Sequence, residues 1–241
     1  MKFKISQLVI RLKKVIPGPL KSVLRALGLG KLQSLLRNTS TVELDYQKSL
    51  AEVVRNNQPE LLEYWRRHRF LDDVNAICRI DSDTRVLDVG CGISTVLHFV
   101  KGERYGIDPL AGEYKRLYPF PEGIDIRRGY GEKIPFPDEY FDIVFSSSAL
   151  DHVIHPPKTV AEIRRVLKPG GYLVLYVDIF AENQVGGHSR YSLQKKDVYS
   201  LLGNSFRTIF ERELPRIPLK AYVNGSRESC NQELIMILEK V

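Results

Sequence analysis

The sequence predicts an α/β protein built on a mostly parallel sheet, because apolar runs of strand length alternate with segments of helical periodicity over residues 85–241. The clearest strand, residues 86–89, stops in the turn Gly90-Cys91-Gly92, a conformation that favours glycine. A second strand ends in Asp108, near the spacing of about 20 residues at which an acid follows the glycine turn in nucleotide-binding sheets. These observations predict a nucleotide pocket at the carboxyl edge of the sheet.

The residues after the turn narrow the class of ligand that the pocket can bind. In the dinucleotide fingerprint a third glycine follows the second by three residues, and here that position is Thr95. An NAD or FAD site is therefore not predicted, and the sequence contains no Walker loop. Residues 93–101 have the pattern of a helix, whose positive end would face the ligand. What remains suits a nucleoside without a phosphate group.

The first 40 residues differ from the rest of the chain in charge. They contain nine Lys and Arg residues, and the first acid of the chain is Glu43. Without those nine cations, 27 Lys and Arg stand against 29 Asp and Glu, so the net charge of +7 belongs to this segment. Apolar residues lie on helical faces on either side of Pro17-Gly18-Pro19. Residues 1–40 are thus predicted to form a basic amphipathic helical arm, and the slightly acidic remainder does not indicate a nucleic-acid partner.

Three roles stay open for this arm. A basic amphipathic helix can lie on an anionic membrane surface, it can bind a partner or cap the domain, or it can serve as an organellar presequence or nucleic-acid arm. Its uncharged runs are shorter than the roughly 18 to 20 apolar residues of a spanning helix, and no cleavage site of a signal peptide stands out. We expect a cytoplasmic protein, with a peripheral position at the membrane surface as the alternative.

Residues 41–80 read as a helical lead-in. Ser40 and Glu43 form a plausible capping box for a helix that ends near Asn57. Pro59 suits the first turn of a second helix, which continues toward Cys78 and carries Trp65. An aromatic residue among leucines at helical spacing more often packs in a core than in a substrate lid, and both readings stay open for Trp65.

The three cysteines predict neither a disulfide framework nor a metal site. Cys78, Cys91 and Cys230 are odd in number and far apart. We expect buried thiols in a reducing compartment. No clustered set of metal ligands is evident elsewhere in the sequence.

Seven segments have the composition of strands. They cover residues 85–89, 104–108, 124–128, 141–146, 171–178, 206–214 and 232–239. The last contains five consecutive apolar residues, Leu234 to Leu238, which suits a strand buried on both faces.

Four further stretches resemble a known family. They are residues 129–142 with the loop Pro135-Phe136-Pro137, residues 143–153, residues 162–171 ending in Lys168-Pro169-Gly170-Gly171, and residues 188–192, His-Ser-Arg-Tyr-Ser. Together with the glycine turn, in this order and spacing, they resemble the class I S-adenosylmethionine-dependent methyltransferases, in particular the type 11 group. The resemblance covers roughly residues 80–241. It implies that residues 81–241 form a Rossmann-like domain of seven strands in the order 3-2-1-4-5-7-6, with the last strand antiparallel and helices on both faces.

The resemblance also implies a cofactor site for S-adenosylmethionine. Asp88, Gly90, Gly92 and Asp108 would hold the cofactor, and Ser147 would face its methionine end. The family usually has an aspartate for the adenine amino group where this chain has Tyr130. The adenine contact could fall to Tyr130 by stacking, to Glu132, or to backbone groups.

The implied reaction transfers a methyl group to a small-molecule or lipid- or glycan-linked acceptor. A hydroxyl acceptor would benefit from a base, and a histidine is suited to this by its near-neutral pKa. The candidates are Asp151 and His152 after the fourth strand and His188 in the segment expected to cover the acceptor. The alternative function is a non-methylating module that binds S-adenosylmethionine and acts as a membrane-associated interaction or regulatory protein.

Overall fold

The computed structural model describes residues 39–180, 191–217, 219 and 232–241. The chain divides into two compact units, Met1–Tyr46 and Gln47–Val241, and the second contains the whole sheet. The expected helical arm over residues 1–40 lies almost entirely outside the described residues. His188 also lies outside them. Within the described ranges, no helix combines the length and the apolarity needed to cross a membrane.

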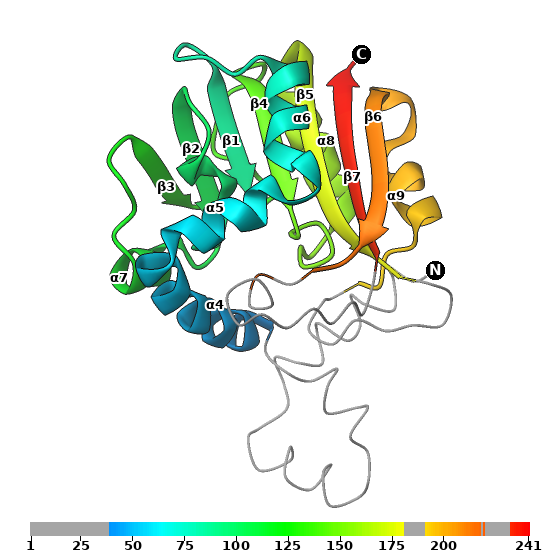
Figure 1. Ribbon diagram of the computed structural model, residues 1–241. Coiled ribbons are helices and arrows are strands. Elements are labelled where there is room, and N and C mark those ends of the chain that lie inside the picture. The colour runs from blue at the N-terminus through cyan, green and yellow to red at the C-terminus, as the bar shows by residue number, and fades with distance from the viewer. Residues whose placement is uncertain (1–38, 181–190, 218, 220–231) are drawn as a thin grey trace, which may run out of the picture. The chain divides into compact units, whose positions relative to one another are not determined.

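A single seven-stranded sheet forms the centre of the second unit (Figure 1). Its strands are β1 (Arg85–Val89), β2 (Glu103–Asp108), β3 (Ile124–Arg128), β4 (Phe141–Ser147), β5 (Leu167–Ile179), β6 (Phe206–Pro215) and β7 (Gln232–Lys240). The spatial order is β3-β2-β1-β4-β5-β7-β6. Strands β1 to β5 pair in parallel, and β7 runs antiparallel to both β5 and β6. The predicted fold class and strand order are confirmed.

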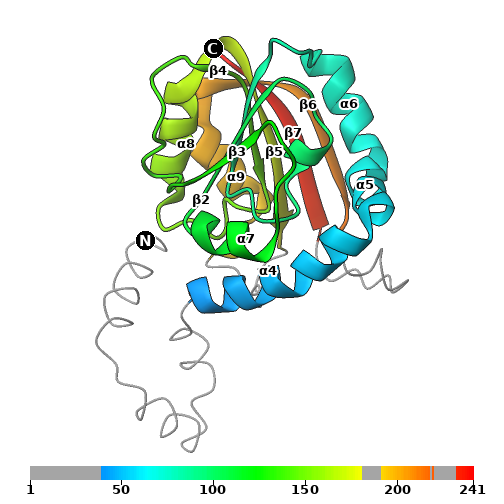
Figure 2. The same ribbon diagram turned by 90° about the vertical axis from the view of Figure 1, so that its left-hand side faces the viewer.

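Helices cover both faces of the sheet (Figure 2). The described helices are α4 (Thr39–Asn56), α5 (Gln58–Arg66), α6 (Phe70–Cys78), α7 (Ala111–Leu117), α8 (Pro156–Val166) and α9 (Lys195–Leu202), with short 3-10 helices η1 (Arg67–Arg69), η2 (Val96–His98) and η3 (Gly203–Ser205). In Figure 2, α5 and α6 lie on one face, and α8 lies on the other. Helix α8 is amphipathic, because Val160, Ile163 and Val166 are buried whereas Lys158 and Arg164 lie on its outer side.

The core is formed where the central strands are covered on both sides. Leu234 to Leu238 of β7 are all buried, as are Ile143, Val144 and Phe145 of β4. Trp65 is 4% exposed and packs against Phe70 and Tyr176, so it belongs to the core and not to an open lid. Its ring nitrogen donates a hydrogen bond of 2.9 Å to the carbonyl of Ser94.

The prediction of a helix over residues 93–101 is wrong. Only the three-residue helix η2 follows the glycine turn. The Thr95 hydroxyl accepts a hydrogen bond from the Leu97 amide and donates one to Asp88, so local side-chain contacts replace the expected helix start. No α-helix dipole points at the turn in this part of the chain.

The lead-in helices also differ from expectation in their ends. Helix α4 starts at Thr39, which places Ser40 inside the helix instead of at its cap. The second predicted helix is broken into α5 and α6 at η1, where His68 and Arg69 have positive φ values of 55° and 61°. Non-glycine residues in this region store backbone strain. The break turns Arg67 into the protein, where only 5% of it is exposed.

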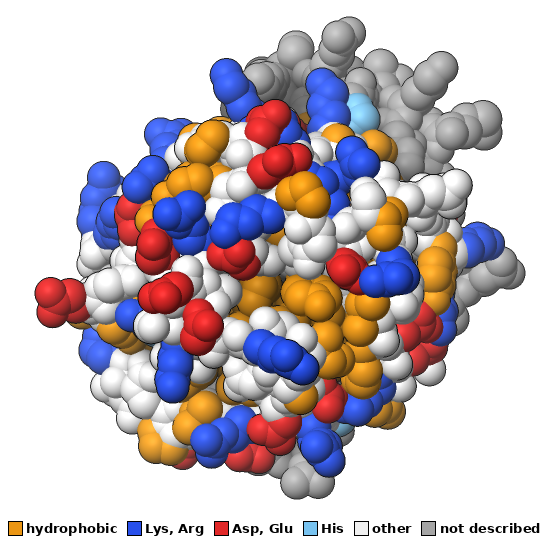
Figure 3. Space-filling model, turned by 90° about the horizontal axis from the view of Figure 1, so that it is seen from above, with side chains coloured by type: hydrophobic (Ala, Val, Ile, Leu, Met, Phe, Trp, Pro, Cys, Tyr) orange, Lys and Arg blue, Asp and Glu red, His pale blue; other side chains and the backbone are white. Residues whose placement is uncertain are grey.

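The outer surface carries both signs of charge. Figure 3, which views the molecule from above, shows Lys and Arg side chains interspersed with Asp and Glu. This face therefore has no broad positive field of the kind that binds nucleic acid.

Candidate functional site

The glycine turn follows β1 as the sequence predicts. Gly90 has φ 75°, and its amide donates a hydrogen bond of 2.8 Å to the Ile107 carbonyl of the neighbouring strand. A Cβ atom at Gly90 would lie 2.5 Å from the Cβ of Ala149, which follows β4 in the chain. Between the glycines, burial raises the pKa of the Cys91 thiol well above its usual range, which makes Cys91 a packed side chain and not a reactive one.

Gly92 meets a second element of the protein. Its φ is 56°, and a Cβ atom there would lie 2.9 Å from the side-chain nitrogen of Gln47 in α4. The side-chain oxygen of Gln47 accepts a hydrogen bond of 2.9 Å from the Ile93 amide. The missing Cβ atoms of Gly90 and Gly92 thus let Ala149 and the Gln47 side chain pack against the turn. Sequence reasoning missed Gln47 because it precedes Gly92 by 45 residues.

Asp108 lies beside this turn at the end of β2. One of its carboxylate oxygens accepts a hydrogen bond from the Leu110 amide at 2.9 Å, and the other lies 3.4 Å from the Gly92 amide nitrogen. A carboxylate has about four lone-pair sites and can accept several hydrogen bonds at once. The spacing argument therefore identified two groups that the fold brings together.

Asp88 lies within β1, two residues before the glycine turn. It is 1% exposed, and the Thr95 hydroxyl donates a hydrogen bond of 2.7 Å to its Oδ2. Burial, reinforced by the negative charge of Asp108, raises the pKa of Asp88 to about 7 despite that bond. Its Oδ1 has no hydrogen-bond partner among the described residues.

Tyr130 and Glu132 follow β3 and differ in their surroundings. The Tyr130 side chain is 43% exposed, and its backbone bridges to Lys133. The Glu132 carboxylate accepts a hydrogen bond of 2.8 Å from the amide of His155, which is the N-cap residue of α8. Glu132 is therefore engaged at a helix start, whereas the ring of Tyr130 lies at the surface.

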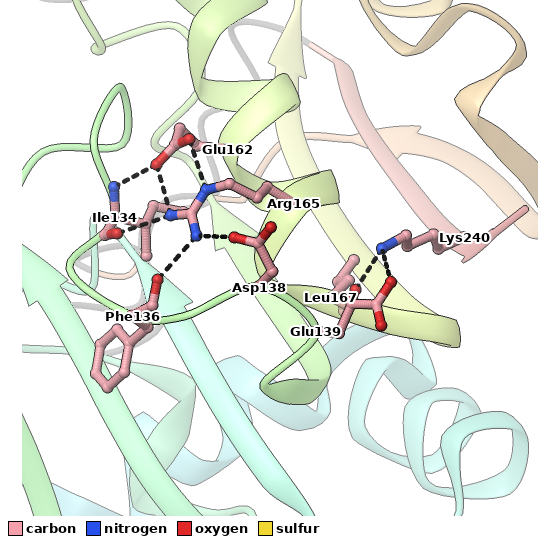
Figure 4. A network of polar contacts seen from close by, with 8 residues as sticks. All are labelled: Ile134, Phe136, Asp138, Glu139, Glu162, Arg165, Leu167 and Lys240. Carbon is pink, nitrogen blue, oxygen red and sulfur yellow. Dashed lines mark hydrogen bonds and ion pairs between the residues drawn. The ribbon is translucent and has the colours of Figure 1, made fainter.

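Arg165 of α8 holds the loop that follows these residues (Figure 4). Its guanidinium donates hydrogen bonds of 2.9 Å to the carbonyls of Ile134 and Phe136. It also forms ion pairs of 2.8 Å with Asp138 and Glu162. Sequence reasoning recognised the segment around Arg165 but assigned this residue no task.

The end of β4 adds polar side chains to the same edge. Ser148 has φ 50°, and its amide donates a hydrogen bond of 2.7 Å to the carbonyl of Tyr176 in β5. The hydroxyls of Ser146 and Ser147 are buried without a hydrogen-bond partner among the described residues. Because Ala149 contacts the position of Gly90, this turn and the glycine turn are neighbours.

Asp151 and His152 follow in the same turn. Asp151 is 1% exposed, and its Oδ2 lies 3.4 Å from Nε2 of His152. Its backbone carbonyl accepts a hydrogen bond of 3.0 Å from Tyr191, the first described residue after the segment that contains His188. Two of the three catalytic candidates thus lie together, and the third is outside the described residues.

A buried charge network, which sequence reasoning missed, extends this edge to β5 and β7. Arg216 pairs with Asp178 at 3.0 Å, and Arg67 pairs with Glu233 at 3.4 Å. Burial raises the pKa values of Asp178 and Glu233 to about 7, against the effect of the two arginines. The only sequence signal was an acid adjoining the apolar run of each strand.

A family model described as a methyltransferase domain matches residues 87–175. The match runs from β1 into β5 and includes the glycine turn, Asp108, Ser147 and Asp151. The chain carries a methyltransferase domain. Enzymes of this kind take the methyl group from S-adenosylmethionine.

Relatives of this methyltransferase domain include a phthiotriol/phenolphthiotriol dimycocerosates methyltransferase of Mycobacterium ulcerans. It is 33% identical over 143 residues, which are 55% of this chain and 48% of the relative. The chain thus matches about half the length of this curated relative.

Solved structures share the fold of the methyltransferase domain at low identity. An S-adenosylmethionine-dependent methyltransferase of Methanosarcina mazei superposes with a TM-score of 0.54 at 18% identity, over 72% of this chain and 98% of the other. The cyclase SpnF superposes with a TM-score of 0.55 at 21% identity, over 71% of this chain and 80% of the other.

The residues present at the turn fit this cofactor. The Asp108 carboxylate stands beside a turn with two positive-φ glycines, at the carboxyl edge where such sheets bind nucleosides. Buried oxygens of Asp88 and Ser147 have no hydrogen-bond partner among the described residues, and buried polar atoms of this kind require one.

Proposed function

We propose that this protein is a methyltransferase that transfers the methyl group of S-adenosylmethionine to a small-molecule or lipid- or glycan-linked acceptor. The observation that carries the proposal is the contact of 3.4 Å between the Asp108 carboxylate and the Gly92 amide, within the segment that matches the family. In this proposal Asp108 accepts hydrogen bonds from the ribose hydroxyls. Asp88, Gly90 and Gly92 shape the turn, and Ser147 binds near the methionine end.

The adenine side of the site is proposed from Tyr130 and Glu132. The exposed ring of Tyr130 is available for stacking on a purine. Glu132 supports this side indirectly, because its carboxylate fixes the start of α8. Arg165 keeps the loop over residues 134–138 in place through two backbone carbonyls.

S-adenosylmethionine supplies an activated methyl group, so the protein mainly has to align the acceptor with it. We propose Asp151, His152 and His188 as the catalytic candidates. The 3.4 Å approach of Asp151 to His152 supports a proton-accepting role, because a buried carboxylate orients the imidazole and stabilises its charged form.

The acceptor class is proposed from two observations. A relative is named for phthiotriol and phenolphthiotriol dimycocerosates, and another, from Bordetella avium, for ubiquinone and menaquinone biosynthesis. The nine cations and apolar helical faces of residues 1–40 suit an anionic membrane surface. We therefore propose a cytoplasmic enzyme that is peripheral at the membrane, with residues 1–40 as its arm, residues 41–80 as lead-in and residues 81–241 as catalytic domain.

Calorimetric titration of the full-length protein with S-adenosylhomocysteine tests the cofactor site. Asp108→Asn should weaken binding about tenfold to a hundredfold, because hydrogen bonds to a charged acceptor contribute roughly 1.5–3 kcal/mol. Asp125→Asn is the matched control, since Asp125 pairs with Arg127 on the exposed side of β3. Equal affinities for the wild type and both variants would reject the role of Asp108.

The membrane arm has its own test. Deletion of residues 1–40 should abolish co-sedimentation with vesicles that contain anionic lipid, without changing the affinity for S-adenosylhomocysteine. Undiminished vesicle binding would reject the membrane role, and a loss of cofactor affinity would instead favour a capping role.

The second candidate function is a module that binds S-adenosylmethionine without transferring its methyl group. Two observations favour it. Tyr130 stands where the family usually has an aspartate, and SpnF, whose fold is similar to that of this chain, is named as a cyclase. Assays of methyl transfer to a panel of acceptors decide between the two. Cofactor binding without turnover on any acceptor would support this second function.

A further inference from the structure

Three carboxylates lie where β4 and β5 end and β7 begins, a region that we name the acceptor side of the sheet. Asp178 and Glu233 are directly opposite each other in the β5–β7 ladder, so their side chains share one face. Asp151 follows β4, and its negative charge adds to the raised pKa of Asp178. All three are more than nine-tenths buried. The groups that face them are the guanidinium of Arg216 on Asp178, the guanidinium of Arg67 on Glu233 and the imidazole of His152 on Asp151.

Polar atoms without a partner mark the same place. Tyr176 precedes Asp178 by two residues and therefore lies on the same face of β5. Its hydroxyl and Oδ1 of Asp151 are buried and have no hydrogen-bond partner among the described residues. The same holds for the hydroxyl of Ser147, which is opposite Tyr176 in the β4–β5 ladder. Arg67 packs against this face, with its guanidinium 4.7 Å from the centre of the Tyr176 ring.

We propose that Asp178 is the base that deprotonates a hydroxyl group of the acceptor, and that Tyr176 holds that group by a hydrogen bond. This inference rests on the proposed methyltransferase function and specifies its acceptor as a hydroxyl compound. It assigns to Asp178 the proton-accepting role for which Asp151, His152 and His188 are the candidates from the sequence. Asp151 is the neighbouring carboxylate that keeps Asp178 ready to take up a proton.

The step balances without a further reactant. The acceptor oxygen forms a bond to the methyl carbon while the bond from that carbon to sulfur breaks, and the bonding pair stays on sulfur. The proton of the hydroxyl passes to the carboxylate of Asp178 and is later released to water. The products are the methyl ether, S-adenosylhomocysteine and one proton.

The charge balance favours a neutral hydroxyl over a cationic amine. Asp178 and Glu233 each have an arginine partner, so neither of these two carboxylates is left to bind a permanent cation. A base with a pKa near neutrality is the kind that removes a hydroxyl proton most effectively. The pKa of Asp178 is raised to about 7, mainly by burial. The phenol of Tyr64, whose raised pKa also reflects Asp178, stays neutral in this range.

The test uses the full-length protein with S-adenosylmethionine and three probes in detergent micelles. Nonylphenol and glycerol monolaurate offer hydroxyl groups, and dodecylamine offers an amine. We expect the wild type to methylate a hydroxyl probe, with kcat/KM rising with pH to a plateau above about 7. Asp178→Asn should lower kcat about a hundredfold or more and remove the rising limb, while KM and the affinity for S-adenosylhomocysteine stay within about threefold. Asp125→Asn is the matched control.

Tyr176→Phe provides an independent readout on a variant that should fold. The Tyr176 hydroxyl has no hydrogen-bond partner within the part of the chain that the structure describes, so its removal should leave stability unchanged or improve it. The same substitution should, however, raise KM for the hydroxyl probe about tenfold. The proposal is overturned if Asp178→Asn keeps the wild-type rate and pH profile, if Tyr176→Phe leaves KM unchanged, or if only dodecylamine is methylated. A wild-type protein that binds S-adenosylhomocysteine but methylates no hydroxyl probe also overturns it. A wild-type protein that does not bind S-adenosylhomocysteine refutes the proposed function itself.

Discussion

The two halves of the carboxyl edge are built by different means. On the proposed cofactor side, the turn after β1 is shaped by backbone: two positive-φ glycines, their amides and one neighbouring carboxylate, Asp108. On the proposed acceptor side, the edge of β5 and β7 is shaped by buried ion pairs, such as Arg67 with Glu233. A backbone site keeps its form when charges change, whereas a buried ion pair fails if one partner is removed. The difference indicates that removal of one charge destabilises the acceptor side more than the cofactor side.

The largest expected effect is on the acceptor side. Arg67→Ala leaves Glu233 as a buried charge without its partner and removes the guanidinium that lies 3.5 Å from the Tyr64 ring. Breaking such a pair should lower the free energy of unfolding by about 3–5 kcal/mol, measured by urea denaturation. Arg127→Ala is the control, because its ion pair with Asp125 is exposed and should contribute about 1 kcal/mol or less. Equal losses in the two variants would erase the proposed difference between the regions.

A smaller loss is expected on the cofactor side. Gly90→Ala places a Cβ atom 2.5 Å from that of Ala149 and gives alanine a φ of 75°. Overpacking and the left-handed backbone together should cost about 2–4 kcal/mol, and the affinity for S-adenosylhomocysteine should fall with the shape of the turn.

Gly112→Ala is the matched control for that substitution. No atom lies within 4 Å of a Cβ at Gly112, which lies in α7 and should be stabilised by alanine. A Gly90→Ala protein with the stability and affinity of the control would show that the turn has more freedom than its geometry indicates.

The same contrast explains what the sequence could predict. The cofactor side was predictable because its parts are linked by short spacing: Gly90, Gly92 and Asp108 lie on consecutive strands. The strand order followed from the resemblance of whole motifs. The exception was the helix expected over residues 93–101, where the side chain of Thr95 satisfies Asp88 and a backbone amide and only η2 forms.

The acceptor side was not predictable, because its groups come from distant segments. Arg67, Asp178 and Glu233 belong to the lead-in, to β5 and to β7, and no local pattern relates them. Their meeting depends on two features that periodicity does not encode. One is the break between α5 and α6 at the positive-φ residues, and the other is the register that pairs Asp178 with Glu233.

An intermediate effect is expected for the loop that leads from β3 to β4. Arg165→Ala removes hydrogen bonds to the carbonyls of Ile134 and Phe136 and the ion pair with Glu162 (Figure 4). Charge-assisted hydrogen bonds of this kind contribute roughly 1.5–3 kcal/mol, and we expect a loss in the lower part of that range because Arg165 is 30% exposed. Hydrogen exchange at residues 134–138 should rise in the variant. Arg164→Ala, on the outer side of the same helix, should leave that exchange unchanged.

The smallest expected effect is that of a single titrating group on the pH dependence of stability, which compares the two sides directly. Asp88 on the cofactor side and Asp178 and Glu233 on the acceptor side have pKa values raised to about 7 in the folded protein. The folded state therefore holds protons that the unfolded chain has already released. Stability is greatest below the unfolded pKa values and falls as pH rises through about 7, by about 1 kcal/mol for each group between roughly pH 6 and pH 8.

Denaturation of the wild type, Asp88→Asn and Glu233→Gln across this pH range separates the contributions, since each substitution removes one titrating group. We expect each variant to lose a similar part of the slope. If Asp88→Asn alone abolished it, the arginines on the acceptor side would have to hold Asp178 and Glu233 ionised throughout. The acceptor side would then be a permanently charged site, and Asp178 could not produce a rising limb near pH 7 in the rate of methyl transfer.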